Sequence, residues 1–127
     1  MVKYWAVFDD LAAHPEKSPN LLDPVARDQA RSQRQIALST YAAKGWTQTG
    51  TAAVSDVSAS STAATTYVVT ACVDVSAINF VDENGDSQVA PGRRDRQRFT
   101  YKVVKTDSNF FVTEDTLEGK RDCCTNR

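Results

Sequence analysis

The amino-acid composition of the chain changes abruptly at Gly45, and this change limits the fold class more than any other feature. Residues 2–44 carry apolar side chains at helical spacing and are interrupted by prolines. Residues 46–80 contain no Lys, Arg, Glu or Pro and are rich in Thr, Val, Ser and Ala. β-Branched residues at this density favour strands. The sequence therefore predicts a helical N-terminal part followed by a β-rich remainder.

Two helices are predicted before Gly45. The first presents one apolar face, made of Tyr4, Trp5, Phe8, Leu11 and Ala12. It is expected to end before Pro15, because proline breaks the helical pattern. The second is predicted to begin at Pro24 with Asp23 as its N-cap, and to end at Gly45, which suits a left-handed C-terminal cap.

The remainder predicts four strands, at about 46–58, about 63–80, 98–105 and 110–119. The first turn is placed in the stretch "ASSTA", and later turns at Asn84-Gly85 and in "TDSN". Alternation in the second strand puts Val73 on one face and Cys72 and Asp74 on the other. Helices before antiparallel hairpins indicate an α+β fold, with the helices packed on one side of a curved sheet of about four strands.

Length and charge limit the class of protein. The 127 residues fit one domain, predicted to span 1–127 with a core at about 3–124. A net charge of -1 gives no basic excess for a phosphate backbone, so nucleic acid is not an expected partner. No run reaches the roughly 18 apolar residues of a membrane span. The apolar stretch 4–8 is too short for a signal peptide, so either the protein is cytoplasmic or its leader lies upstream of this chain.

Several phrases together resemble a known superfamily. They are "YWAVFDDL", "ALSTYAAKGW", "TACVDVSAINFVDENGD" and "GRRDRQRFTYKVVKTDSNFFVTEDTLEGKRDC". Their order is similar to that in the cone-shaped nuclear transport factor 2-like superfamily, and within it to small secreted or lipid-anchored domains of high-GC Gram-positive bacteria. The resemblance implies an α+β cone, an extracytoplasmic location and a signal or lipobox before the domain.

The same resemblance implies a disulfide between the strand cysteine, Cys72, and a cysteine after the last strand. Cys123 fills the second position, with Cys124 as the alternative partner. Such a bridge fits an oxidising compartment. Two other states remain open, namely three free thiols in a cytosolic protein and a vicinal bridge within the tail. No metal is expected, because three cysteines and His14 without Cys-x-x-Cys spacing do not supply four zinc ligands.

Two surface or cavity sites are predicted. A pocket between the first helix and the sheet would be lined by Trp5, Phe8, Asp74 and Tyr101. In enzymes with this cone, an acid on a central strand can act as a general base, and Asp74 is the candidate. A docking patch for an acidic surface or anionic lipid headgroups would be formed by Arg93, Arg94, Arg96 and Arg98. Both sites also have ordinary structural explanations. The aromatic residues can belong to the core, Asp74 can accept hydrogen bonds from loop amides, and the arginines can lie on a solvated hairpin.

No catalytic constellation is evident, and no cofactor is expected. His14, next to Pro15, is predicted to lie exposed at a helix end. The leading hypothesis is a non-enzymatic binding or accessory domain at the cell envelope, taking a protein or small-molecule ligand and able to form a homodimer through its sheet face. Membrane anchoring would need a segment outside this chain. The alternatives are a small isomerase or dehydratase-like enzyme using the cone, and a periplasmic-type scaffold domain of a secretion or conjugation system.

Overall fold

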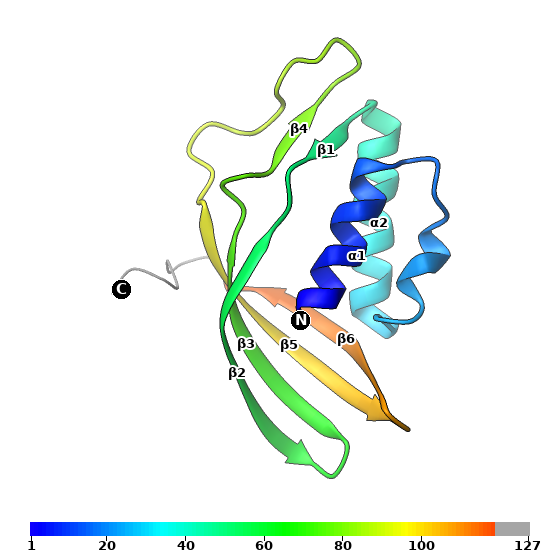
Figure 1. Ribbon diagram of the computed structural model, residues 1–127, viewed down its shortest axis with the longest axis vertical. Coiled ribbons are helices and arrows are strands. Elements are labelled where there is room, and N and C mark those ends of the chain that lie inside the picture. Colours follow the sequence, from blue (N-terminus) through cyan, green and yellow to red (C-terminus); the bar gives the residue numbers. More distant parts are fainter. Residues whose placement is uncertain (119–127) are drawn as a thin grey trace.

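A computed structural model describes residues 1–118 and shows two helices packed on the concave side of a curved antiparallel sheet (Figure 1). The helical elements are α1 (Val2–Ala13), the short 3₁₀ helix η1 (Pro19–Leu22) and α2 (Asp28–Lys44). The strands are β1 (Thr47–Thr49), β2 (Ala53–Ala63), β3 (Thr66–Asp74), β4 (Asn79–Val81), β5 (Arg96–Thr106) and β6 (Asn109–Leu117). The predicted α+β class is confirmed.

The main sheet has the strand order β2-β3-β5-β6, and all its pairs are antiparallel. β3 and β5 pair from Thr66↔Val104 to Asp74↔Arg96, so the inward side chains of both strands meet the helices. The core they share is aromatic and aliphatic, and includes Tyr4, Trp5, Phe8, Val69, Ala71, Val73, Phe99, Tyr101 and Val112. The hairpin end of β2 and β3 extends beyond the helices, which leaves part of the concave face uncovered (Figure 1).

α1 has the predicted apolar face and a buried acid beside it. Asp9 is 4% exposed. Its Oδ1 accepts a hydrogen bond from Gln48 Nε2 at 2.8 Å, and its Oδ2 accepts one from the Ala52 backbone N–H at 2.9 Å. A buried carboxylate needs such donors, because losing water without replacement costs several kcal/mol. Asp9 therefore fixes α1 against the connection between β1 and β2.

α2 begins four residues later than the sequence predicted. Residues 24–27 are not helical, because Val25 and Ala26 lie alongside β6: the Val112 N–H donates to the Val25 carbonyl at 2.9 Å, and Arg27 N–H donates to the Val112 carbonyl at 2.9 Å. Tertiary pairing thus overrides the Asp-Pro helix start. The predicted C-cap is correct, with Gly45 at φ 71°. No helix within residues 1–118 is long and apolar enough to cross a membrane.

The strand boundaries differ from the prediction in two places. "ASSTA" lies within β2, and the turn falls at residues 64–65, because these small residues continue the pairing with β3. The long strand predicted at 63–80 is split into β3 and β4 by a turn in which Ile78 N–H donates to the Val75 carbonyl at 2.9 Å. β4 pairs with β1 in a separate two-stranded sheet.

Gly50 is required where β1 passes to β2. Its φ is 76°, and a Cβ at this position would lie 1.9 Å from the Ala77 carbonyl oxygen. Only glycine allows this approach of two backbones. The Asn84-Gly85 turn forms as predicted, with Gly85 N–H donating to the Asp82 carbonyl at 3.0 Å, and the last hairpin turns at residues 107–108.

Candidate functional site

The clearest cavity among the described residues lies at the mouth of the cone, where the start of α1 faces the uncovered part of the sheet. Its volume is about 420 Å³. Inward side chains of β2, β3, β5 and β6 form its walls, and the segment before α2 closes one side. The lining residues are Met1, Lys3, Tyr4, Pro24, Val25, Val57, Ala59, Val69, Val103, Ser108, Asn109, Phe110 and Val112.

This mouth pocket is mainly apolar and still open to solvent. Val57 and Phe110 are 52% and 55% exposed, an unusual state for large apolar side chains that line a concavity. Lys3 is the one charged side chain in the described lining, which contains no carboxylate, histidine or cysteine. The pocket can therefore bind an apolar group, and the titratable side chains of its described lining are Lys3 and Tyr4.

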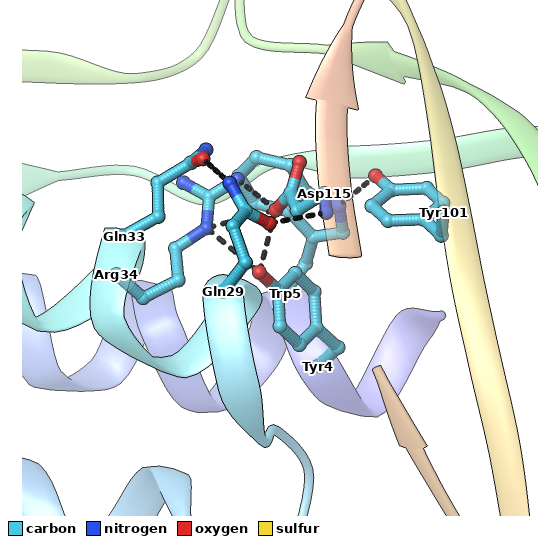
Figure 2. A network of polar contacts seen from close by, with 7 residues as sticks. All are labelled: Tyr4, Trp5, Gln29, Gln33, Arg34, Tyr101 and Asp115. Carbon is cyan, nitrogen blue, oxygen red and sulfur yellow. Dashed lines mark hydrogen bonds and ion pairs between the residues drawn. The ribbon is translucent and has the colours of Figure 1, made fainter. Parts of the chain in front are cut away.

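Behind the pocket, three polar side chains form a buried network (Figure 2). Tyr4 from α1 donates its hydroxyl to Asp115 Oδ2 of β6 at 2.5 Å. Arg34 of α2 donates from Nη2 to the same oxygen at 2.6 Å and from Nε at 3.1 Å. Arg34 Nε also donates to the Tyr4 hydroxyl at 2.9 Å. One carboxylate oxygen thus receives donors from two different helices.

Aromatic rings surround the charged group of Arg34. Its guanidinium carbon lies 4.4 Å from the ring centre of Trp5 and 4.7 Å from that of Phe8. Trp5 Nε1 in turn donates to the Tyr101 hydroxyl at 2.7 Å (Figure 2). Cation–π attraction and the Asp115 carboxylate together offset the cost of burying the arginine charge.

This network occupies the cone interior and leaves little freedom to Asp115. The side chain of Asp115 is 0% exposed and that of Arg34 is 10% exposed. Asp115 Oδ1 has no hydrogen-bond partner among the described residues, whereas Oδ2 accepts all three donors. Removing either partner of this pair would leave the other charge buried and uncompensated, so the pair has a structural role.

Stability should fall at alkaline pH because of the tyrosines in this network. Burial raises the pKa of both Tyr4 and Tyr101 above the ordinary value. In the unfolded chain these tyrosines ionise near pH 10, while the folded state keeps them neutral. Their contribution is thus complete below about pH 10 and is lost as the pH rises further. Each group adds a slope of about 1.4 kcal/mol per pH unit.

Urea unfolding at a series of pH values above about 10 measures this slope. The Tyr4→Phe variant removes one of the two ionisations and should lose about 1.4 kcal/mol per pH unit of slope, whatever its stability at neutral pH. A variant with the same slope as the wild type would show that Tyr4 is not protected from ionisation.

The four residues predicted to line a pocket lie in different environments. Trp5, Phe8 and Tyr101 are 5%, 3% and 1% exposed and belong to the core. Asp74 lies on the outer face of β3, where its Oδ1 accepts from Ser76 N–H at 2.9 Å and Arg96 lies 4.0 Å away. The hydrogen bonds with Ser76 hold the pKa of Asp74 below its usual value. A general base near neutral pH needs a raised pKa, so this position does not suit Asp74 for that role.

The four predicted docking arginines do not form one free patch. Arg93 donates to the Ile78 carbonyl at 2.9 Å and lies 3.8 Å from Asp95, so it joins its loop to the turn between β3 and β4. Arg94 is exposed on that loop, while Arg96 and Arg98 lie along the outer side of β5. His14 is exposed at the end of α1, 3.2 Å from Asp10. No metal-binding cluster occurs within the described residues.

Cys72 is 1% exposed on the outer face of β3, where it pairs in register with Arg98. Cys123 and Cys124 lie outside the described residues. Glu118, the last described residue, donates its backbone N–H to the Arg98 carbonyl at 2.9 Å. The start of the C-terminal segment therefore lies one strand away from Cys72.

Sequence reasoning missed Arg34 and Asp115 as a pair. They are 81 positions apart, and each sits in a segment that reads as ordinary surface. The available signals were weak. Arg34 falls on the side of α2 that carries Ala30. Alternation from Val112 would place Asp115 on the outer face, but a bulge at Thr113 turns it inward, opposite Tyr101.

No protein-family model matches the chain, and no curated protein matches its sequence. Solved structures do match. The intermembrane space region of the chloroplast protein ARC6 aligns with a TM-score of 0.63 at 19% identity, covering 91% of this chain and 89% of that one. A scytalone dehydratase-like protein from Novosphingobium aromaticivorans aligns with a TM-score of 0.53 at 16% identity, covering 92% and 76%.

The chain shares the architecture of these solved structures, two helices on a curved antiparallel sheet, which agrees with the α+β cone that the resemblance to the nuclear transport factor 2-like superfamily implies. Kfla4162 from Kribbella flavida is also similar, with a TM-score of 0.57 at 14% identity over 91% of this chain and 85% of that one. These TM-scores show a shared fold, at identities below 20%. The neighbours include both an enzyme-like protein and a region of a chloroplast protein, so the architecture leaves the function open.

Proposed function

We propose that this chain is a non-enzymatic binding domain that works outside the cytoplasmic membrane and takes a small apolar ligand in the mouth pocket. The observation that carries the proposal is the combination of an open apolar pocket with a cone interior already filled by the Tyr4–Arg34–Asp115 network. Apolar walls with few polar groups are typical of ligand sites.

The described pocket lining supports binding without turnover. General acid–base chemistry needs a titratable group within hydrogen-bond reach of the ligand, and of the two in the described lining, Lys3 and Tyr4, Tyr4 already donates its hydroxyl to Asp115. The acid nearest to the pocket through hydrogen bonds is Asp115, which lies behind Tyr4 and is bound by Arg34. An isomerase or dehydratase-like enzyme remains the second candidate, favoured by the Tyr4 hydroxyl at the inner end of the pocket.

The extracytoplasmic location rests on a proposed bridge between Cys72 and Cys123. Glu118 is fixed next to Arg98, the register neighbour of Cys72, and Thr100 of the same outer face donates to the Glu118 carboxylate. Adjacent strands are about 4.8 Å apart, and five further residues can span up to about 17 Å. Cys123 can therefore reach Cys72, which favours an oxidising compartment.

A charge placed inside the pocket should abolish binding, whereas the same charge on the other face should not. Ala59 lines the pocket and pairs with Val69, while its neighbour Ser60 pairs with Val68 and faces outward; both are exposed. We expect Ala59→Asp to weaken binding of the uncharged fluorophore N-phenyl-1-naphthylamine at least about tenfold, because the ligand would desolvate the carboxylate.

Fluorescence titration measures this effect, with Ser60→Asp as the matched control. The control should bind within about twofold of the wild type, a free-energy change of about 0.4 kcal/mol. Equal losses in both variants, or no binding by the wild type, would refute the mouth pocket as the ligand site.

A further inference from the structure

The two edges of the main sheet differ in how their backbone groups are satisfied. The β6 edge is closed by the segment before α2: Val112 exchanges hydrogen bonds with Val25 and Arg27 at 2.9 Å each. Farther along, the Asp115 N–H donates to Gln29 Oε1 at 2.9 Å. Closing an edge in this way removes the unpaired row of N–H and C=O groups that another strand could bind.

The β2 edge has no such cover within the described part of the chain. Among residues 1–118, β2 ends the strand order and pairs only with β3. Ten of its eleven residues are exposed, and the helices lie over the concave face, away from this edge (Figure 1). The Ala52 N–H donates to the Asp9 carboxylate, but Ala52 lies just before the first residue of β2.

The usual protections of an edge strand lie at the two ends of β2 and leave its middle, Ser58 to Ser61, in regular pairing with β3. Natural edges are blunted by lysine, proline, inward charges or bulges. In β2 one register shift lies between Ser55 and Ser58 and includes Asp56 at φ 51°, and a second lies between Ser61 and Ala63. Residues 57–63, "VSASSTA", contain no ionisable side chain and no proline, and most of them are Ser, Ala or Thr.

We propose that a second copy of this chain adds to β2 as an antiparallel strand and joins the two four-stranded sheets into one of eight strands. A two-fold pair brings the same segment against itself. Residues 57–63 suit such pairing, because no like charges meet in any register between two uncharged segments. Small side chains also allow close approach on both faces.

The positions of charged and apolar residues on the rest of the sheet favour the β2 edge over the outer face as the dimer contact. The outer side of β5 carries Arg96, Arg98 and Lys102, which a symmetric face-to-face contact would bring near their own copies. The exposed apolar side chains Val57 of β2 and Phe110 of β6 lie instead on the concave side, at the mouth pocket. Pairing at β2 would continue that concave wall into the second copy.

The test places charges on the outward side of the edge, away from the pocket. Ser58 and Ser60 face outward, opposite Thr70 and Val68 of β3. We expect the wild type to dimerise with rising concentration in sedimentation velocity. The double variants S58K/S60K and S58E/S60E should each dimerise at least about tenfold more weakly, because like charges would then meet across the two-fold.

An equimolar mixture of the lysine and glutamate variants should restore dimers, because opposite charges then face one another. The variant S32K/S39K carries the same added charge on exposed positions of α2 and should behave as the wild type. Circular dichroism confirms that each variant is folded. Binding of N-phenyl-1-naphthylamine should persist in all of them, which separates this test from that of the mouth pocket.

A wild type that stays monomeric up to millimolar concentration would overturn the proposal. It would do so even if β2 paired with a strand of another protein. Dimers that are unaffected by the paired lysines or glutamates would equally contradict it, because they would form through a different surface.

Discussion

Replacing Asp115 with alanine is expected to lower the free energy of unfolding by about 3–5 kcal/mol. The change removes the partner of a guanidinium that is almost completely buried among aromatic rings. A buried charge without its counter-ion costs far more than the intact pair contributes. Urea unfolding of the purified variant at neutral pH measures the loss.

Glu114→Ala is the matched control, because Glu114 is the adjacent residue on the opposite, exposed side of β6 and contacts Lys102 at 3.4 Å. Its loss should be within about 1 kcal/mol, as for other exposed ion pairs. The double replacement Arg34→Met with Asp115→Leu should be less destabilising than Asp115→Ala, since no charge is then left unpaired. Equal losses for Asp115→Ala and Glu114→Ala would contradict a buried ion pair.

Loss of the proposed bridge between Cys72 and Cys123 is expected to have a similar effect. It would close a loop of about 50 residues, which contributes about 4 kcal/mol in the chain-entropy model. Cys123→Ser should lower the free energy of unfolding by this amount under non-reducing conditions. Cys124→Ser should change it by less than about 0.5 kcal/mol, as is usual for surface substitutions.

Intact mass after alkylation without reduction checks the bridge directly. One alkylated cysteine is expected in the wild type, and none in Cys124→Ser. Three alkylated cysteines in the wild type would contradict the bridge and with it the argument for an oxidising compartment. A loss of stability in Cys124→Ser rather than in Cys123→Ser would assign Cys124 as the partner.

Much of the fold follows from local sequence patterns. The apolar face of α1, the glycine cap of α2, the alternation of β3 and β5, and the Asn84-Gly85 turn all depend on residues close in the chain. The errors arose where distant segments meet. Val25 and Ala26 pair with β6 instead of starting the helix, and "ASSTA" extends β2 because β3 is available to pair with it.

The candidate site was less predictable than the fold for the same reason. The pocket walls come from four strands and the start of α1, and the rule of alternation alone did not show where the helices stop covering the sheet. Asp74 was favoured as the cone acid because it lies on a central strand, yet alternation also places it with Cys72 on the outer face. The acid inside the cone is Asp115, whose partner Arg34 comes from another element.

We expect the interior of the cone to stabilise the fold and its mouth to bind the ligand. Filling the interior with Trp5, Phe8 and the Arg34–Asp115 pair leaves the uncovered concave face as the accessible apolar surface. The polar outer face of the sheet and the closed β6 edge contribute no comparable apolar hollow among residues 1–118.

A methyl-resolved NMR titration of the wild-type protein with N-phenyl-1-naphthylamine tests this most directly, because valines mark both faces of the sheet. We predict saturable shifts in the methyl signals of Val57, Val69, Val103 and Val112 at the mouth, with Val68 and Val104 of the outer face unchanged. Shifts confined to Val68 and Val104, or no saturable shift at any valine, would contradict a ligand site at the mouth of the cone.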